Sequence, residues 1–226
     1  PAMKVRTMGP LREFDALAPA WRELLEQTGQ TSPLASHEWF ASCWRTAGPE
    51  RRRELWMVED CAGPVAMIPL VSRRARMWGL PVRRLEFLGA SDAPFVDVPL
   101  AGDADAVTNV LLETLNKRRD WDMLALGRLP AQSPLLKTLT VAVADRFPWQ
   151  LTDRIESPYL TLSGSWDQFL AGLPSAVREA VGEVEGAHAR RGSLVTEAYH
   201  AIDPDGAVFA DAVEVAKVSS RDGRNA

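Results

Sequence analysis

Several residue types that mark specialised proteins are scarce in this chain. Its 226 residues include two cysteines, three histidines and two tyrosines. Cys43 and Cys61 form neither a disulfide framework nor a zinc-binding spacing, so we expect both to be buried or half-buried thiols. His188 and His200 have no partner at metal-ligand spacing, so the sequence predicts no metal site.

Long apolar runs and a large excess of charge of one sign are also lacking. The longest apolar stretches, such as VAMIPLV at Val65–Val71, are too short to span a bilayer, and no signal-peptide pattern is visible. A net charge of −4 without an aromatic and basic stripe gives no indication of nucleic-acid binding. With 46% hydrophobic and 25% charged residues, the composition is that of an ordinary globular protein, which we expect to be cytoplasmic.

Hydrophobic periodicity and turn residues predict an alternation of helices and strands. Helices are predicted at 10–29, His37–Ala47, Ala104–Arg118, Gln132–Asp145, Ser175–Arg191 and Ala207–Val218. Strands are predicted at Met3–Met8, Glu54–Glu59, Pro64–Ser72, Val82–Leu88, Trp121–Leu126, Trp149–Arg154 and Tyr159–Leu162, with Pro69 as the sign of an edge strand or a bulge. This order predicts an α/β (α+β) fold in which a mixed, mostly antiparallel central sheet has helices on both faces.

A series of segments in this order resembles a known protein family. They are Trp21-x-x-Leu24, SPLASHEWFASCW (Ser32–Trp44), GPVAMIPL (Gly63–Leu70), LEFLG (Leu85–Gly89) followed by Asp92 and Asp97, WDMLALGRLPAQS (Trp121–Ser133) and SPYLTLSGSWDQFLAGL (Ser157–Leu173). With these segments the chain resembles the tandem-GNAT acetyltransferase-like proteins of the cellulose-biosynthesis CelD/BcsL type, which are relatives of the Fem-type aminoacyl transferases. The resemblance implies a GNAT-like fold and a bacterial protein of exopolysaccharide biosynthesis.

The resemblance also implies a domain organisation and a function. Residues 1–163 are expected to form an N-terminal GNAT-like domain, and residues 164–226 linker helices and the start of a truncated second GNAT-like domain. The chain is then the acceptor-binding half of an N- or O-acyltransferase that uses an acyl-CoA or aminoacyl donor and a small-molecule amine or saccharide acceptor. One departure is the helix Ser175–Arg191, where Glu179, Glu183 and Glu185 replace the basic residues typical of the family, so anion binding by this helix is not expected.

The loop after the strand Val82–Leu88 bears on whether this domain binds CoA. A strand that opens through a glycine into a helix is a common phosphate site, because free amides and the helix dipole favour an anion. In GNAT proteins the equivalent loop has an [R/Q]-x-x-G-x-[G/A] pattern that binds the CoA pyrophosphate. Here GASDAPFVDVPLAGDAD lacks this glycine spacing, carries four aspartates, and loses an amide donor at Pro94 and at Pro99. Acetyl-CoA or another acyl-CoA is therefore implied by the resemblance alone, without support from this loop.

Two aspartates of this loop are candidate catalytic residues. Asp92 and Asp97 follow the carboxyl end of a strand, where open α/β sheets place their ligands. A carboxylate there can hold an amine or hydroxyl, or accept its proton. The alternative interpretation is that both residues order the loop through Asx-turns. Asp103 is instead interpreted as the N-cap of the following helix.

Five further residues are candidates for substrate binding. His37, Trp39 and Trp44 share one helix, which His37 begins, and could line a groove. The alternative for His37 is a partly exposed residue at a helix start. Arg128 and Ser133 follow the strand Trp121–Leu126, whose end borders the acyl-donor cleft in GNAT proteins.

Two surface features leave a different class of function open. Arginines at 51–53, 73, 74, 76, 83 and 84 form either a solvated face or a surface that attracts an anionic polymer, a nucleotide-sugar or an acidic partner domain. The helix Ala207–Val218 has an apolar side that predicts a homodimer or a contact with a further C-terminal domain. The alternative to an acyltransferase half is therefore a catalytically inactive GNAT-like scaffold that binds a partner protein or a polysaccharide.

Overall fold

The chain forms two compact units, residues 1–154 and residues 155–226. The structure is a computed structural model that describes residues 3–144, 146–152, 155, 156, 158, 160, 164–192, 195, 197–199, 202, 203 and 205–222. The domain boundary expected after residue 163 stays a prediction.

A five-stranded sheet in the order β1-β2-β3-β4-β5 organises the first unit. Antiparallel neighbours are β1 (Lys4–Met8), β2 (Arg52–Glu59), β3 (Pro64–Met77) and β4 (Leu80–Phe87), and β5 (Met123–Ala125) runs parallel to β4. Five consecutive residues of β2, Glu54–Val58, are buried, which requires that both faces of the sheet are covered.

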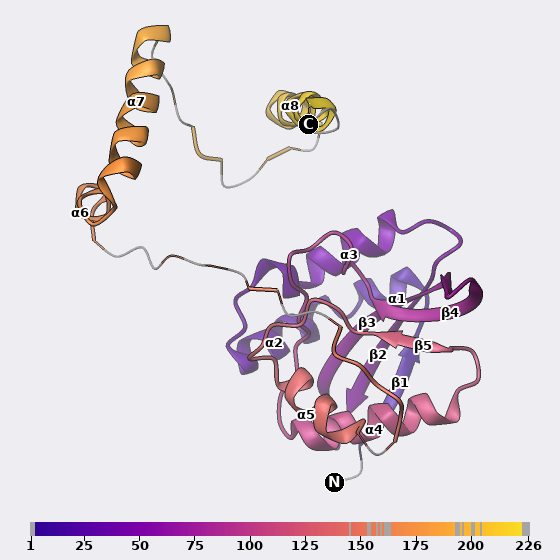
Figure 1. Cartoon of the computed structure of the whole chain (residues 1–226). Helices are drawn as coiled ribbons and strands as arrows, with labels where there is room; N and C mark the ends of the chain where they lie inside the picture. Colours follow the sequence, from indigo (N-terminus) through magenta and orange to yellow (C-terminus); the bar gives the residue numbers. More distant parts are fainter. Residues whose placement is uncertain are drawn as a thin grey trace. The chain divides into compact units, whose positions relative to one another are not determined.

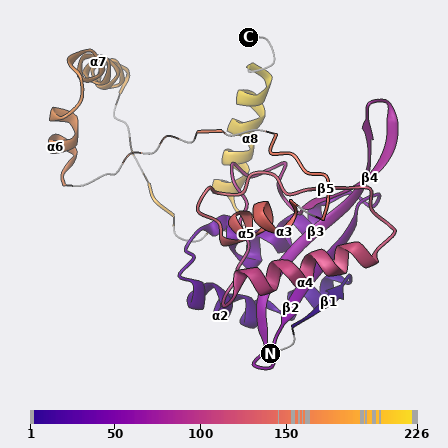
Figure 2. The ribbon, with the colours of Figure 1, turned by 60° about the horizontal axis from the view of Figure 1, so that its bottom comes forward.

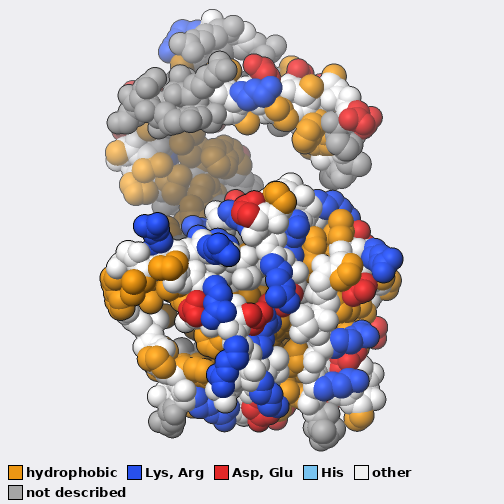
Figure 3. All heavy atoms as spheres, turned by 90° about the vertical axis from the view of Figure 1, so that its right-hand side faces the viewer, with side chains coloured by type: hydrophobic (Ala, Val, Ile, Leu, Met, Phe, Trp, Pro, Cys, Tyr) orange, Lys and Arg blue, Asp and Glu red, His pale blue; other side chains and the backbone are white. Residues whose placement is uncertain are grey.

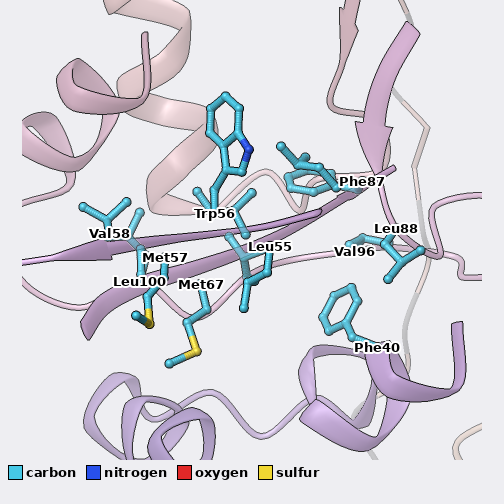
Figure 4. Close-up of a cluster of buried hydrophobic side chains, with 14 of the residues drawn as sticks. Phe40, Leu55, Trp56, Met57, Val58, Met67, Phe87, Leu88, Val96 and Leu100 are labelled. Atoms are coloured by element: carbon cyan, nitrogen blue, oxygen red, sulfur yellow. The ribbon is translucent and has the colours of Figure 1, made fainter. Parts of the chain in front are cut away.

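Helices cover the two faces of this sheet (Figure 1). One face carries α1 (Leu11–Asp15), α2 (Ala18–Thr28), the short 3-10 helix η1 (Pro33–Ala35) and α3 (His37–Thr46), and the other carries α4 (Ala104–Lys117) and α5 (Pro134–Ala142). Side chains on opposite faces of β2 enter different halves of the core, with Trp56 pointing away from Leu55 (Figure 4). The predicted α/β fold with a mixed, mostly antiparallel sheet is confirmed.

The helix predicted over 10–29 is interrupted. The structure has two helices, α1 and α2, separated at Ala16 and Leu17. Pro19 lies in the first turn of α2, where its missing N–H and fixed φ are compatible with a helix start but not with a helix interior. The hydrophobic period continues across the break because both helices bury residues in the same core, Phe14 from α1 and Trp21 from α2.

Pro69 marks neither an edge strand nor a register shift, because β3 lies between β2 and β4 and keeps its register there. Its carbonyl accepts a hydrogen bond from the N–H of Leu88 at 3.0 Å, just beyond the end of β4. Along the edge of β3 that faces β4, the next pairing is an isolated bridge between Ala66 and Leu100. Proline is therefore tolerated inside the sheet because it lies where the neighbour of β3 changes.

Other boundaries also differ from the prediction. β3 and β4 pair as far as Met77 and Leu80, because the arginine-rich run between them continues the ladder rather than forming a loop. The described part of the predicted strand Trp149–Arg154, residues 149–152, is not a strand, and the predicted strand Tyr159–Leu162 lies outside the described residues apart from Leu160.

The second unit contains three helices in its described part, α6 (Trp166–Ala171), α7 (Ser175–Arg191) and α8 (Ala207–Asp222). α6 begins with a capping box, in which the side chain of Ser165 accepts from the N–H of Gln168 and the Gln168 side chain accepts from the N–H of Ser165. Among the described residues, no helix has the length and apolar character needed to cross a membrane.

Candidate functional site

The parallel strands β4 and β5 pair over a short distance and then separate. Their register covers only three positions, from Arg84 opposite Met123 to Glu86 opposite Ala125. Past these positions, the loop that follows β4 returns to the chain that follows β5. The N–H of Val96 donates to the carbonyl of Arg128 at 2.9 Å. The guanidinium Nη1 of Arg128 donates to the carbonyl of Ala93 at 2.7 Å.

The same loop is also bonded to the other side of the opening, on β3. The N–H of Met67 donates to the carbonyl of Pro99 at 3.2 Å, and the N–H of Ala101 donates to the carbonyl of Val65 at 2.8 Å. These bonds flank the bridge between Ala66 and Leu100. Residues Ala93–Leu100, which we call the inserted segment, are thus held by backbone hydrogen bonds to both β3 and the chain after β5.

Apolar side chains make the inserted segment part of the core. Ala93, Val96, Val98 and Leu100 are buried, with exposed fractions from 0% to 8%. Figure 4 shows Val96 beside Leu88, the first residue after β4. The space beyond the ends of β4 and β5 is therefore filled by the protein itself.

Asp97 and Ser133 are brought together by the inserted segment. The hydroxyl of Ser133, which is 1% exposed, donates to Oδ1 of Asp97 at 2.9 Å, and the N–H of Val98 donates to the same oxygen at 3.0 Å. Burial raises the pKa of the Asp97 carboxyl, while the hydrogen bonds from Ser133 and Val98 act to lower it. The bond from Ser133 ties the inserted segment to the start of α5, which begins at the next residue.

Asp92 lies apart from Asp97, on an open groove of about 380 Å³. The groove is lined by Cys43, Thr46, Ala47, Gly48, Glu50, Arg51, Val71, Glu86, Phe87, Leu88, Gly89, Ser91 and Asp92. Glu86 is bonded to Arg73, while the exposed carboxylate of Asp92 accepts only from the Ser91 hydroxyl, at 3.1 Å, among the described residues. The third acid of the lining, Glu50, lies 3.6 Å from Nε of Arg51, so Asp92 is the lining acid that has no ion pair among the described residues and is open to a cationic or hydroxylic ligand.

The thiol of Cys43 also lines this groove. Burial, followed by the nearby charge of Asp92, raises the pKa of the Cys43 thiol. A raised pKa keeps the sulfur protonated at neutral pH, so the groove does not present an activated thiolate nucleophile. The other cysteine, Cys61, is exposed in the turn between β2 and β3, so the expectation of a half-buried thiol is wrong for that residue.

His37 and Trp44 belong to an aromatic cluster beneath α1–α3. Nε2 of His37 donates to the carbonyl of Phe14 at 3.0 Å, and the two rings stack at a centroid distance of 4.8 Å. His37 is 5% and Trp44 is 3% exposed. These positions correspond to core residues, not to the wall of a groove beside Asp92. Trp44 instead lines a neighbouring open depression of about 520 Å³, which shares Arg51 with the groove and also includes Arg45, Arg52 and Arg53.

Trp39 reaches the loop from the helix side. It is half-buried, and its indole nitrogen is buried with no hydrogen-bond partner among the described atoms. A Cβ at Gly89 would lie 3.2 Å from that nitrogen and 2.8 Å from Sγ of Cys43. Gly89, with a φ of +80°, therefore lets the chain leave β4 in close contact with α3. Of the residues predicted from the sequence, Asp97 lies in the inserted segment and Arg128 and Ser133 bond to it. Trp39 lies beside Gly89, where the chain leaves β4 toward the segment.

The inserted segment itself was not recognised in the sequence, although a signal for it exists. Val96, Val98 and Leu100 alternate with other residues, a period of two that is typical of extended chain with one buried face. In the part of the chain that the structure describes, no group of three or more His, Cys, Asp and Glu residues could hold a metal ion. The side chain of His188 and all of His200 lie outside the described residues.

Known proteins similar to this chain are distant ones among solved structures. No protein-family model matches the chain, and neither does any curated protein. Among solved structures, it is similar to a probable acetyltransferase, at 12% identity and a TM-score of 0.39 over 72% of this chain and 99% of the other. It is similar to a ribosomal-protein-alanine N-acetyltransferase from Brucella melitensis biovar Abortus 2308, at 16% identity and a TM-score of 0.39 over 72% of this chain and 100% of the other.

A third similarity is to a GCN5-related N-acetyltransferase from Ralstonia eutropha JMP134, at 12% identity and a TM-score of 0.37 over 70% of this chain and 99% of the other. Together these are distant similarities of fold to GNAT N-acetyltransferases.

Proposed function

We propose that this chain is an acyltransferase-related domain that binds an acceptor molecule and does not bind an acyl-CoA between β4 and β5. The observation that carries this proposal is the inserted segment. It is hydrogen-bonded to Arg128 and to β3, and it occupies the position where the acyl-donor cleft of a GNAT domain is expected. In a tandem-GNAT protein of the CelD/BcsL type, the domain is then the acceptor-binding half, and the acyl-CoA or aminoacyl donor binds elsewhere.

The groove at the end of β4 is the proposed acceptor site. Asp92 supplies a carboxylate that can hold the ammonium or hydroxyl group of an acceptor. In the transfer, the acceptor nitrogen or oxygen forms a bond to the acyl carbon, the bond from that carbon to the leaving group breaks, and the acceptor's proton passes to a base. Asp92 is the residue of this chain placed to accept that proton, whereas Asp97 is committed to Ser133.

Calorimetric titration with acetyl-CoA and with a long-chain acyl-CoA tests the first part of the proposal. We expect no heat of binding, because the pyrophosphate loop pattern is absent and the donor space is filled. Micromolar binding of either ligand would mean that the chain has a donor site of its own, and the proposed division of roles would be wrong.

A matched pair of sugars tests the acceptor site. Glucosamine, but not glucose, is expected to shift amide signals of Gly89–Asp92 in an NMR titration, because only glucosamine carries an ammonium group. Asp92→Asn is expected to weaken this binding about tenfold, the loss of one charge-assisted hydrogen bond. Asp105→Asn, a change of the same kind in the first turn of α4, is the control and should leave it unchanged. Equal responses to the two sugars would contradict an amine acceptor held by the charge of Asp92.

A catalytically inactive scaffold is the second candidate, and the same filled space favours it, because it leaves no donor site in this unit. This candidate predicts binding of a neutral polysaccharide without any need for an amine. Titration with cellohexaose distinguishes the two candidates: binding that survives Asp92→Asn supports the scaffold, and absence of binding together with a response to glucosamine supports the acceptor site.

A further inference from the structure

The hairpin formed by β3 and β4 extends beyond the rest of the sheet (Figure 2). Its outer half pairs Arg73–Met77 with Leu80–Arg84, and Trp78 and Gly79 form the turn. The tip is apolar and open to solvent: Trp78 is 92% exposed, Leu80 66% and Met77 37%. Three large apolar side chains at the end of a projecting element need an explanation outside the packing of this unit.

The backbone of the turn makes the tryptophan more unusual. Trp78 has a φ of 49° and Gly79 a φ of 82°. A two-residue hairpin turn with two positive φ angles favours Asn-Gly or Gly-Gly, and a bulky residue in the left-handed region is disfavoured. Neither burial nor turn geometry in the first unit accounts for Trp78 at this position, so we look for an interaction outside this unit.

Arginines surround the apolar tip. The stretch Ser72–Leu85 contains five arginines and no acidic residue, in a chain whose net charge is −4. Arg73 and Arg84 are bonded to Glu86, and Arg83 is bonded to Asp122. Two arginines, at 74 and 76, have no ion pair among the described residues and are exposed. Figure 3, a view toward this side of the molecule, shows Lys and Arg side chains across the face with hydrophobic side chains between them.

Strand alternation separates cations from apolar groups near the tip. Arg74 lies opposite Arg83, and Arg76 follows on the same face of the hairpin. Met77 lies opposite Leu80 on the other face, where Ala75 and Val82 also pair. The end of the hairpin is thus amphipathic, with an apolar face and tip beside a row of cations.

We propose that this hairpin binds the surface of an anionic membrane. Trp78, Met77 and Leu80 enter the boundary between headgroups and acyl chains, where tryptophan is favoured, and Arg74 and Arg76 contact lipid phosphates. A second copy of the chain fits less well, because its hairpin would bring arginines against arginines. A nucleic acid would pair with the arginines and stack on Trp78, but it offers no apolar partner to Met77, Leu80 and Val82. This proposal is independent of the acceptor site.

Co-sedimentation of the full chain with vesicles tests the proposal. Binding is expected to vesicles of equal parts phosphatidylserine and phosphatidylcholine, to weaken as NaCl is raised, and to be much weaker with phosphatidylcholine alone. Arg74→Gln with Arg76→Gln should weaken binding about fivefold for each arginine. The control is Arg12→Gln with Arg22→Gln, which removes two exposed arginines of α1 and α2 and should change nothing.

Trp78→Asn separates binding from folding. Asparagine suits the left-handed turn, so the melting temperature should stay the same or rise while vesicle binding falls severalfold. Trp149→Ala, which removes a 49% exposed tryptophan of the same unit, should leave vesicle binding unchanged. Full vesicle binding by Trp78→Asn overturns the proposal, and so does binding of single-stranded DNA or polyglutamate by a chain that does not bind anionic vesicles.

Discussion

The backbone N–H of Val96 donates a hydrogen bond to the carbonyl of Arg128 at 2.9 Å, which joins the loop after β4 to the loop after β5. Arg128 has a φ of 67°, an uncommon conformation for a residue with a side chain, and its guanidinium returns the contact by donating to Ala93. This reciprocal pair holds the inserted segment where the two parallel strands separate, so the filling of that space depends on a few identifiable contacts.

Removing apolar volume from the inserted segment should destabilise the first unit. Val96→Ala deletes two buried methyl groups from a fully buried side chain, so we expect the free energy of unfolding to fall by about 2 kcal/mol. Val141→Ala is the matched control, because Val141 is 74% exposed, and its effect should stay within about 0.5 kcal/mol. Urea denaturation measures both. Equal effects would indicate that the segment is not packed in the core.

Asp97 should make the stability of the chain depend on pH. Its pKa is raised in the folded state by burial, so the folded chain holds this proton more tightly than the unfolded chain. The resulting contribution favours folding below the ordinary carboxyl pKa of about 4 and is lost as the pH rises through the higher pKa of the folded state. Asp97→Asn lacks this titration.

The free energy of unfolding of Asp97→Asn, relative to wild type, should therefore increase as the pH is raised from about 4 toward neutrality. Urea denaturation of both proteins over a series of pH values gives this difference directly. A difference that shrinks as the pH rises would show that the hydrogen bonds from Ser133 and Val98 outweigh the burial of the carboxylate.

Gly89 should be sensitive to substitution for two separable reasons. In Gly89→Ala the new Cβ meets Sγ of Cys43 at 2.8 Å, and the alanine also has to adopt a φ of +80°. Gly102→Ala isolates the backbone cost, because Gly102 has a φ of +75° and its new Cβ would have no neighbouring atom within 4 Å. We expect about 1 kcal/mol of destabilisation for Gly102→Ala and at least twice that for Gly89→Ala, measured by thermal unfolding. Similar costs would mean that α3 moves to accommodate the methyl group.

The ion pair between Arg118 and the buried Glu54 should contribute far more to the stability of the fold than the exposed ion pair between Arg52 and Asp120. Nη1 of Arg118 donates to Oε1 of Glu54 at 2.8 Å, and the Glu54 side chain is 2% exposed. Arg118→Ala strands this carboxylate in the core and should cost about 3–5 kcal/mol. Arg52→Ala, which removes an exposed partner of Asp120, should cost at most about 1 kcal/mol. Chemical denaturation distinguishes the two, and a small effect of Arg118→Ala would imply that water reaches Glu54.

Local signals in the sequence were enough to predict several helix starts. Ser36 accepts from the N–H of Trp39, and Asp103 from the N–H groups of Asp105 and Ala106, as their positions before apolar-periodic segments predict. Such caps depend on residues within one turn of each other. The periodicity of α4 likewise predicts an inward face of Val107, Val110, Leu111, Leu112 and Leu115, of which all but the half-buried Val110 are buried.

The candidate site could be predicted only in part. The sequence indicates Asp97, Arg128 and Ser133 as candidates. Nothing in it shows that Asp97 and Ser133, which are 36 residues apart in the chain, lie within hydrogen-bonding distance. Because His37 and Trp44 share a helix with Trp39, the sequence groups them with the site, but that helix turns both side chains into the aromatic core with Phe14. The hydrophobic period of a helix predicts on which side of the helix a residue lies, but not which part of the protein packs against that side.

The sequence by itself determined most of the element order, two helix caps, the alternating fold class and the lack of a CoA pyrophosphate pattern, because each depends on residues close together in the chain. Only the tertiary structure decided that the loop after β4 fills the space beside β5 and that the arginine-rich run extends a hairpin with Trp78 at its tip. The reason is physical: pairings such as Val96 with Arg128 and Ala66 with Leu100 join distant segments, and their stability comes from burial and hydrogen bonds that exist only once the sheet has formed.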